Sequence, residues 1–394
     1  MSQCAVKSGQ LPVGWKVKRL DKVLKLDYGK PLPKDQRDDN GKFPAYGANG
    51  IKCRTNRFYW DKPTIIVGRK GSAGEVNLTE NKFWPLDVTY FVNFDEHEYN
   101  LKFLYFCLVS LHLPKLAKGV KPGINRNDVY DIEFAFPPLP EQKRIVAILD
   151  EAFSGIAQAV ANAEKNLANA REVFESYLNG VFARRGEGWV DAPIEEHIKF
   201  IDYRGRTPRK TNKGIRLITA KNVKMGFLQL EPQEFVDPKI YEDWMIRGIP
   251  KKGDVLFTTE APLGNVAQLD TVKKVVFAQR VIIMQPNREM LKPTFLKYIF
   301  LSRTFQFILH EKATGATTKG IKASLLKKIP ISIPPISEQK DIIKKLDTLK
   351  SKTQNLETIY KKKLTALSEL KQSILQKAFT GELTADKIQK QANP

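Results

Sequence analysis

Hydrophobic residues recur at steps of three and four along a stretch that begins shortly after Pro140. The pattern places them on one stripe of a helix, and a single extra step of four is typical of a coiled coil with one stutter. About 40 residues of such a helix extend roughly 60 Å. The stripe consists of Ile145, Leu149, Ala152, Ile156, Val160, Ala163, Leu167, Ala170, Phe174, Tyr177 and Val181.

A rougher copy of this stripe lies near the C-terminal end. The two copies follow nearly identical segments, FPPLPEQK from Phe136 and IPPISEQK from Ile333. Paired prolines end the preceding strand, and the glutamate suits the first turn of a helix. One helix cannot bury such a stripe alone, so we expect the two to pack together; the alternative is two separate surface helices. The second stripe consists of Ile342, Leu346, Leu349, Leu356, Tyr360, Leu364, Leu367, Ile374 and Ala378.

The segments before the two helices have a mixed pattern. Short apolar runs separated by turn signals predict strands, and apolar runs of helical spacing follow them. Each half therefore resembles an α+β globule that ends in a long helix. The strand candidates are IIVG at Ile65, VTYFVNF at Val88, DIEFAF at Asp131, DVLFTT at Asp254 and VVFAQRVIIM at Val275; the helix candidates are LKFLYFCLVSLHL at Leu101 and KPTFLKYIFLSRTFQFILH at Lys292.

Charge narrows the range of partners. The 394 residues have 65 Lys and Arg against 43 Asp and Glu, a formal net charge of +22. This excess favours a polyanion, most simply nucleic acid. We expect no membrane partner, because no apolar run reaches the roughly 18 residues that span a bilayer. The N-terminal MSQCAVKSGQ lacks an apolar core and the three cysteines form no CxxC pair, which predicts a cytoplasmic location.

Motifs for catalysis are missing from the sequence. It has no GxxxxGK[ST] loop for ATP hydrolysis, no Asn/Asp-Pro-Pro-aromatic tetrad of the kind that amino-methylating enzymes use, and no histidines at metal-ligand spacing. The Glu and Lys of EQK lack the further carboxylates that a magnesium-dependent nuclease needs. We therefore expect the chain to be non-catalytic by itself, with no metal site and no cofactor of its own.

Several segments together resemble one known family. The duplicated PPxxEQ segments, each followed by a long helix, are similar to those of the specificity subunit of type I restriction-modification systems. Further similarity lies in IIVGRKGSAGEV at Ile65, FWPLDVTYFV at Phe83 and RGRTPRKTNKGIRLITAKNV at Arg204. The resemblance covers nearly the whole chain.

This resemblance implies an α+β fold class: two α+β target recognition domains with pseudo-twofold symmetry, separated and joined by two long antiparallel coiled-coil helices. The implied division is 1–139 for the N-terminal target recognition domain, 140–184 for the central spacer helix, 185–336 for the second target recognition domain, 337–383 for the C-terminal spacer helix and 384–394 for a polar tail.

The resemblance also implies a function. Each domain would read one half of a bipartite, asymmetric site in double-stranded DNA, with the half-sites about one helical turn, roughly 34 Å, apart. The helices would set that spacing and dock two modification subunits. Those subunits would use S-adenosylmethionine to methylate adenine, and two restriction subunits, which use ATP and Mg²⁺, can join.

Basic and polar residues in loops are the candidate DNA contacts. A solvated basic face is the alternative for the second-half cluster, and a plain hairpin turn is the alternative for GRKGSAG at Gly68. Glu260 can accept a hydrogen bond from cytosine N4. The candidates are Lys30, Arg69, Lys70, Ser72, Lys121, Asn125, Arg126, Tyr203, Arg204, Arg206, Thr207, Arg209, Lys221, Asn222, Thr259, Glu260, Thr317, Thr318 and Lys319.

Some helix positions are candidates for docking a modification subunit. Ala157, Ala161 and Ala168 allow close approach of another helix, and surplus apolar residues widen the stripe beyond one seam; the alternative is that the recognition domains cover that surplus. The surplus consists of Val146, Phe153, Val173 and Leu178.

Two other functions stay open from the sequence. A non-enzymatic scaffold would bind nucleic acid through charge alone, with a steep salt dependence and no sequence preference. A self-sufficient nuclease would cleave DNA with Mg²⁺ and no partner.

Overall fold

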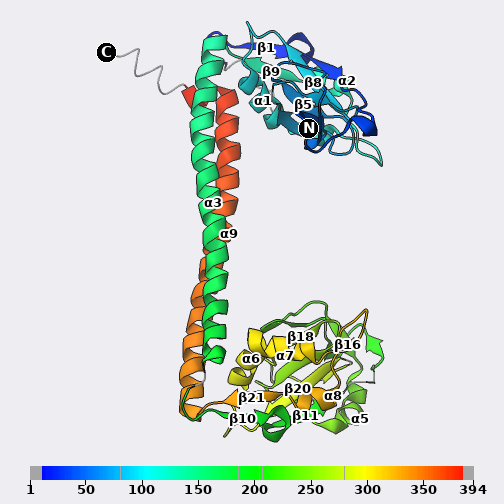
Figure 1. Ribbon diagram of the computed structural model, residues 1–394, viewed down its shortest axis with the longest axis vertical. Helices are drawn as coiled ribbons and strands as arrows, with labels where there is room; N and C mark the ends of the chain where they lie inside the picture. The colour runs from blue at the N-terminus through cyan, green and yellow to red at the C-terminus, as the bar shows by residue number, and fades with distance from the viewer. Residues whose placement is uncertain are drawn as a thin grey trace, which may run out of the picture. The chain divides into compact units, whose positions relative to one another are not determined.

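The structure, a computed structural model, describes residues 11–384 except residues 80, 185, 204, 206 and 279. It divides into two compact units, Met1–Glu164 with Lys362–Pro394 (unit 1) and Lys165–Lys361 (unit 2). Each unit contains one mixed α+β domain and a portion of both long helices (Figure 1). The predicted fold class is confirmed. The finer division into five segments stays a prediction, because the two units each combine domain and helix.

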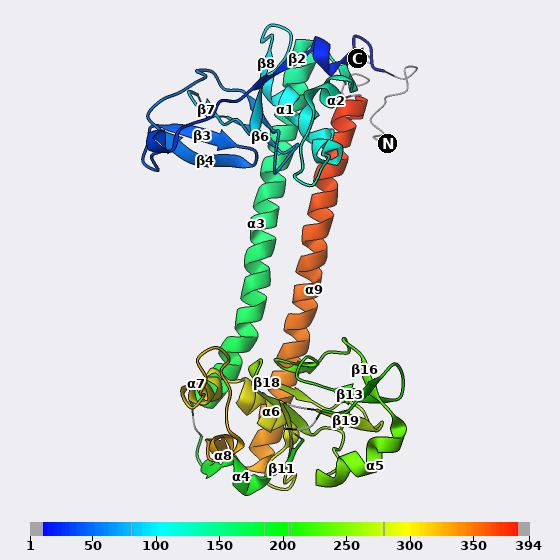
Figure 2. The ribbon, with the colours of Figure 1, turned by 90° about the vertical axis from the view of Figure 1, so that its right-hand side faces the viewer.

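The long helices are α3 (Leu139–Ala183) and α9 (Ile336–Thr380), each of 45 residues. In unit 1, Ile145 near the start of α3 shares a core with Phe379 at the end of α9. In unit 2, Leu346 near the start of α9 packs with Leu178 near the end of α3. The helices therefore run antiparallel within each unit, side by side in both views (Figures 1 and 2).

The predicted stripes are correct in part. On α3, burial of Ile156, Ala163 and Ala170 follows the expected spacing. Tyr177 is 39% exposed and Leu356 is 41% exposed, whereas Thr353 is buried at 6%. In the middle of α9 the buried face therefore passes through Thr353 instead of Leu356, and the prediction for Leu356 and Tyr177 was wrong.

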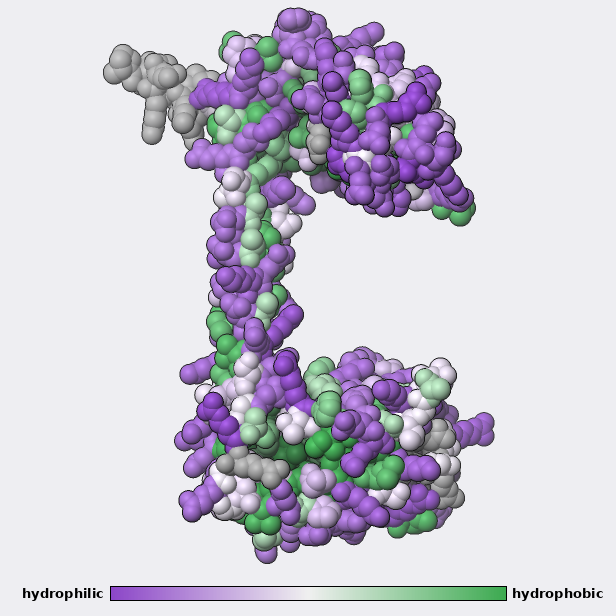
Figure 3. Space-filling view, viewed as in Figure 1, coloured by the Kyte–Doolittle hydropathy of each residue, from purple (hydrophilic) through white to green (hydrophobic). Residues whose placement is uncertain are grey.

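The two α+β domains cover most of the surplus apolar residues of α3. Val146 and Leu178 are buried, and Phe153 packs on the ring of Phe106 at 5.4 Å between centroids. Val173 remains 51% exposed. The alternative interpretation is thus correct for three of the four residues. Hydrophobic residues still lie among hydrophilic ones on the helices in the view of Figure 3.

One helix in the described part of the chain, α3, is long and apolar enough to cross a membrane by length and composition. This corrects the expectation that no stretch would reach that limit. The finding is weak evidence, since a helix buried in a protein core passes the same test.

Two sheets and a two-stranded ribbon build the domain of unit 1. One sheet has the order β2-β8-β5-β6, the other β4-β3-β7, and β1 pairs with β9. The strands are β1 (Lys16–Arg19), β2 (Leu24–Tyr28), β3 (Phe43–Gly47), β4 (Gly50–Thr55), β5 (Ile65–Gly68), β6 (Val76–Leu78), β7 (Trp84–Pro85), β8 (Thr89–Phe94) and β9 (Glu133–Phe136); the helices are α1 (Leu101–Ser110) and α2 (Arg126–Tyr130).

Unit 2 repeats this plan. Its sheets have the orders β11-β20-β17-β18 and β12-β16-β13-β19, with β10 paired to β21 and an added hairpin β14–β15. The strands are β10 (Val190–Pro193), β11 (Ile198–Asp202), β12 (Lys210–Thr211), β13 (Ile215–Ile218), β14 (Val223–Lys224), β15 (Phe227–Leu228), β16 (Glu234–Val236), β17 (Val255–Thr259), β18 (Leu263–Gln268), β19 (Val275–Phe277), β20 (Val281–Pro286) and β21 (Pro330–Ile333). The helices are α4 (Ile194–His197), α5 (Tyr241–Trp244), α6 (Pro293–Leu301), α7 (Arg303–Glu311) and α8 (Ala323–Lys327).

The repeated glutamine explains why the PPxxEQ segment occurs twice. Gln142 is 1% exposed; its Oε1 accepts from the backbone N–H of Asn100 at 2.8 Å, and its Nε2 donates to the carbonyl of Pro137 at 2.9 Å. Gln339 makes the same pair of bonds, with the N–H of Lys292 at 2.8 Å and the carbonyl of Pro334 at 2.8 Å. Each glutamine thus ties the start of a long helix to the start of α1 or α6.

Candidate nucleic-acid interface

Two loops of unit 1 meet at the end of strand β5. The first is the turn that follows Gly68, and the second, residues 118–123, is closed by mutual backbone bonds between Lys118 and Gly123 at 2.9 and 3.0 Å. The N–H of Gly71 donates to the carbonyl of Pro122 at 2.9 Å, and the N–H of Ile124 donates to the carbonyl of Arg69 at 3.0 Å. The backbone therefore holds the two predicted contact segments against each other.

Unit 2 has the same pair of loops. Thr314 and Gly320 exchange two backbone bonds of 2.9 Å, which close the second loop. The N–H of Ile321 donates to the carbonyl of Thr259 at 3.0 Å, and Gly320 bridges to Glu260. The structure thus places TTEAPLG and GRKGSAG at equivalent positions, as the sequence predicts.

The ring of Tyr28 lies close to the guanidinium groups of two arginines in unit 1. Tyr28, at the end of β2, is 47% exposed, and the guanidinium groups of Arg69 and Arg126 lie 5.4 and 5.1 Å from its ring centroid. Arg69 also donates from Nε and Nη2 to the carbonyl of Asp87 at 3.1 and 2.7 Å. Cation–π contact and these bonds hold two positive groups in defined positions at the surface.

A second tyrosine, Tyr90, packs against Tyr28. Tyr90 is buried at 3% and packs edge-on against Tyr28 at 5.1 Å between centroids. Its hydroxyl donates to the carbonyl of Ile124 at 3.2 Å. Burial, with a smaller effect of Tyr28, raises the pKa of Tyr90, so this hydroxyl keeps its proton and its bond to the loop.

The other candidates of unit 1 lie on the same segments. The carbonyl of Lys30, two residues after Tyr28, accepts from the indole of Trp84 at 3.0 Å. Lys30, Lys70, Ser72 and Lys121 are exposed. Asn125 is exposed too, but its side chain caps α2 by accepting from the N–H of Asn127 at 3.0 Å. Its acceptor oxygen is thus already engaged.

The matching position in unit 2 has an acidic group in place of a basic one. Glu260 forms an ion pair with Arg280, Oε1 to Nε, at 3.0 Å, and both side chains are nearly half exposed. Thr317, Thr318 and Lys319 are exposed on the neighbouring loop. A carboxylate oriented by a guanidinium can accept a hydrogen bond from a base amino group, whereas the two guanidinium groups of the unit 1 cluster can only donate.

Three predicted contacts are corrected by the structure. Tyr203, Asn222 and Thr259 are at most 2% exposed, so their side chains serve the interior. The hydroxyl of Tyr203 bonds to the backbone of residues 247 and 248 at 3.0 and 2.9 Å. The amide of Asn222 donates to the carbonyls of residues 229 and 232 at 3.2 and 3.0 Å. Polar side chains in a basic segment were expected at the surface, but they satisfy distant backbone groups.

The remaining candidates of unit 2 lie near strand β12. Lys221 and Lys210 share the carboxylate of Glu234 at 3.9 and 2.8 Å, which lowers the local positive field. Thr207 and Arg209 are exposed on the segment before β12. Arg204 and Arg206 lie outside the described residues.

Sequence reasoning missed two residues of the interface. Tyr28 lies between a strand and a Gly-Lys pair, where an aromatic at a strand end could have been noticed. Arg280 was placed inside a single strand VVFAQRVIIM, but the structure has two strands there, β19 and β20, and Arg280 lies between them with a φ of 73°. A charged residue inside an apolar run was the available signal.

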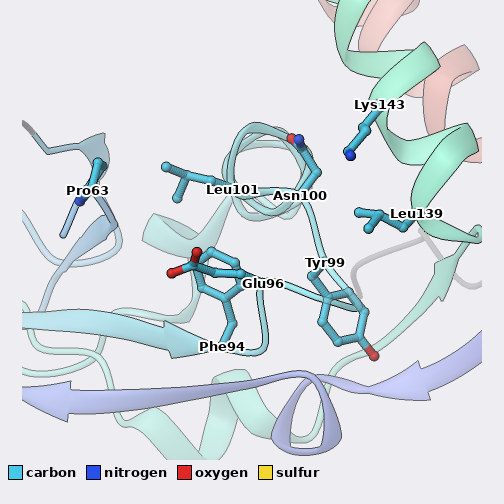
Figure 4. Close-up of a pocket in the computed structure, with 8 residues that line it drawn as sticks. All are labelled: Pro63, Phe94, Glu96, Tyr99, Asn100, Leu101, Leu139 and Lys143. Atoms are coloured by element: carbon cyan, nitrogen blue, oxygen red, sulfur yellow. The ribbon is translucent and has the colours of Figure 1, made fainter.

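A cavity of about 250 Å³ lies apart from these loops, between the end of β8, the start of α1 and the first turns of α3 (Figure 4). Glu96 on its wall pairs with Lys62 at 3.5 Å, and the hydroxyl of Tyr99 accepts from Lys18 at 2.7 Å. Within the described residues, no group of three His, Cys, Asp or Glu side chains could hold a metal ion. The paired loops, which are the turns after β5 and β17 together with residues 118–123 and 314–320, therefore remain the candidate site.

The chain is similar to known proteins over most of its length. The family model described as "Type I restriction modification DNA specificity domain" matches residues 12–164 and 247–366. The type I restriction enzyme EcoDI specificity subunit of Escherichia coli is 23% identical over 415 residues, covering 96% of this chain and 90% of that protein.

Two solved structures share the fold. A chain from a structure on complex assembly and conformational transition of the type I R-M system has a TM-score of 0.74 at 18% identity, covering 95% of this chain and 99% of that chain. The HsdS subunit from Thermoanaerobacter tengcongensis has a TM-score of 0.60 at 20% identity, covering 97% of this chain and 100% of that chain.

Proposed function

Because the chain belongs to the type I restriction-modification DNA specificity family, we propose that it is the DNA sequence-recognition subunit of a type I restriction-modification complex. Each α+β domain reads one half of a bipartite, asymmetric site in double-stranded DNA. The two long helices set the distance between the half-sites.

The observation that carries this proposal is the matched pair of loops. In unit 1 the loop of residues 118–123 is bonded to the turn after β5, and in unit 2 the loop of residues 314–320 is bonded to the turn after β17, by equivalent backbone bonds. The side chains on these loops differ between the units. Unit 1 presents Arg69 and Arg126, whereas unit 2 presents Glu260 and Thr318. The same backbone arrangement with different side chains is what two different half-sites require.

The chemistry belongs to partner subunits. Two modification subunits dock on the helices and use S-adenosylmethionine to methylate the site; restriction subunits, where present, use ATP and Mg²⁺. Exposed Ala157, Ala161, Ala168 and Val173 on α3 support a docking surface there. This chain contributes no catalytic group and acts in the cytoplasm.

A footprint of the chain assembled with its modification subunits tests the proposal. At moderate salt we expect protection of two short segments separated by an unprotected spacer, with adenine methylation confined to that site. The chain without partners, added with Mg²⁺, should leave the DNA uncut; cleavage would show a nuclease.

A scaffold that binds through charge gives a different result. It would protect no defined segment, and its affinity would fall steeply with salt on every duplex alike. Uniform protection would therefore overturn the proposed function.

A further inference from the structure

An exposed ion pair lies where the two loops of unit 2 meet. Glu260 follows strand β17 and Arg280 lies in the turn between β19 and β20, with Oε1 and Nε of the two side chains 3.0 Å apart. The side chain of Arg280 is 48% exposed and that of Glu260 is 47% exposed. Among the residues that the structure describes, neither side chain has a second hydrogen-bond or ion-pair partner. The Nη groups of Arg280 and Oε2 of Glu260 are therefore available to a ligand.

The backbone holds both residues in place. The N–H of Thr259 donates to the carbonyl of Arg280 at 2.9 Å, and Gly320 of the second loop bridges to Glu260. A Cβ built on Gly320 would lie 3.2 Å from the Cβ of Glu260, so this glycine lets the loop approach closely. Arg280 has a φ of 73° and Ala261, next to Glu260, has a φ of 42°, both in the left-handed region that is costly for residues with a Cβ. Such strain persists where the surrounding structure imposes it, and it is concentrated at ligand-contacting sites.

The shared fold of the two domains does not require this ion pair. In unit 1 the backbone bond that matches the one to Arg280 is also 2.9 Å long and ends at the carbonyl of Val88, and the matching bridge to the second loop is made by Lys70. A valine and a lysine thus occupy the positions of Arg280 and Glu260 in the same backbone arrangement. Solvent also screens a half-exposed ion pair, so that it adds little to the free energy of folding. The pair therefore lies at a surface position where the two units differ and contributes little to stability.

The available atoms of the pair match one kind of base pair. In the major groove a G·C pair presents two adjacent acceptors, guanine N7 and O6, followed by the cytosine N4 donor. An A·T pair presents an acceptor, a donor and an acceptor, followed by the thymine methyl group. Two Nη donors beside a carboxylate oxygen give the order donor, donor, acceptor, which complements G·C and does not complement A·T.

We propose that Arg280 and Glu260 are a specificity-determining pair that reads one G·C base pair in the half-site of unit 2. The Nη groups of Arg280 donate to N7 and O6 of the guanine, and Oε2 of Glu260 accepts from N4 of the cytosine on the other strand. The bond between Nε and Oε1 orients the two groups before DNA binds, which lowers the entropy cost of ordering them. This contact rests on the proposed function and specifies one base pair of the target.

Base analogues in the duplex test each contact separately. The chain is assembled with its modification subunits, and the half-site of unit 2 is the half that stays the same when residues 12–138 are exchanged for those of a family member with a different target. In that half-site, 7-deazaguanine removes the N7 acceptor, and 2-pyrimidinone in place of cytosine removes the N4 donor. At one G·C pair each analogue should weaken wild-type binding about tenfold, as expected for the loss of a hydrogen bond to a charged group.

Variants of the two side chains assign each contact. With Arg280→Ala, 7-deazaguanine should cause less than a twofold further loss of affinity, and with Glu260→Ala the same should hold for 2-pyrimidinone. Arg280→Met and Glu260→Met serve if an alanine variant does not fold. Glu242→Ala, which removes an exposed carboxylate that pairs with Lys274 at 3.1 Å, is the matched control and should keep both tenfold losses. Preference for the half-site of unit 1 should be unchanged in every variant, which checks folding and assembly.

Three results overturn the role of this pair: a half-site of unit 2 that has no G·C pair, analogues that leave wild-type binding unchanged, or analogue losses that persist in the variants. In each of these cases a defined bipartite site leaves the proposed function standing. A wild-type complex that binds the footprinted duplex and an unrelated duplex equally well removes the proposed function and this contact together.

Discussion

The junctions between domain and helix differ between the two units. In unit 1, Phe106 of α1 packs on Phe153 of α3, and the ammonium of Lys371 lies 5.1 Å from the Phe153 ring centroid. At the corresponding place in unit 2, Tyr298 bonds to Asp347 and a half-buried Lys350 replaces the second phenylalanine. The unit 1 junction is largely aromatic and adds the Lys102–Asp150 ion pair at 2.6 Å, whereas the unit 2 junction is polar and burial lowers the pKa of Lys297 there.

This difference shows which residues attach each domain to the long helices and which residues differ between the units. Both junctions retain a phenylalanine from the end of the opposite helix: Phe379 packs on Phe103 at 5.4 Å, and Phe182 packs on Phe295 at 5.5 Å. Both retain the buried glutamine of PPxxEQ. The duplicated units therefore keep these phenylalanine and glutamine contacts with the long helices, while the aromatic and charged residues beside the contacts differ.

Phe379→Ala should have the largest effect on the comparison. The residue is 5% exposed and contacts Phe103 and Phe134, so its removal should cost about 3–5 kcal/mol of stability. Hydrogen exchange should rise across unit 1 and stay unchanged in unit 2. Phe307→Ala, at a residue that is 65% exposed on α7, is the matched control and should have little effect.

Gln142→Leu and Gln339→Leu test whether the two glutamines anchor the starts of their helices equally. Each change leaves buried backbone groups without partners, and we expect about 2–4 kcal/mol of destabilisation, similar for both, in urea unfolding. A difference larger than about 1.5 kcal/mol, roughly one hydrogen bond, would show that only one glutamine anchors its helix. Lys143→Leu, one residue along at an exposed position, should be nearly neutral.

Lys297→Met should sharpen the contrast by stabilising unit 2. The pKa of Lys297 is lowered, so the folded chain binds fewer protons than the unfolded chain between about pH 8 and 10.5. Wild-type stability should therefore rise with pH across this window, with the penalty fully present below pH 8. At pH 7 we expect the variant to be about 1–3 kcal/mol more stable, and at pH 9.5 less so. The exposed Lys328→Met should show no such pH-dependent difference.

Arg126→Ala should have the smallest free-energy effect and act on DNA binding alone. Loss of one guanidinium above Tyr28 should weaken binding about tenfold and reduce the salt slope by about 1. Titration at several salt concentrations measures both. Lys22→Ala, in the turn after β1, removes equal charge at a residue outside both loops. If it weakened binding equally, the effect would be net charge rather than a defined contact.

Much of this fold could be predicted from local patterns. The spacing of Ile145, Leu149 and their successors defined α3, and the repeated PPxxEQ located the starts of both helices within a residue or two. The middle of α9 was harder, because Thr353 is buried and Leu356 exposed where the apolar pattern alone favoured the leucine.

The candidate site was predicted less completely. The basic and polar loops were identified, and their pairing in space agrees with the sequence repeat. Burial of Tyr203 and Asn222 could not be foreseen, since their partners are carbonyls and N–H groups up to about 45 positions away along the chain. Tyr28 gains its role only when β2 places it between Arg69 and Arg126, which no local pattern encodes.

The most direct test of the central claim is a methylome measured after one domain is exchanged. Residues 12–138 would be replaced by those of a family member with a different target, and the chain expressed with its modification subunits. We expect one half of the methylated sequence to change while the other half and the spacer length stay the same. A change in both halves, or a loss of sequence preference, would contradict independent reading by the two units.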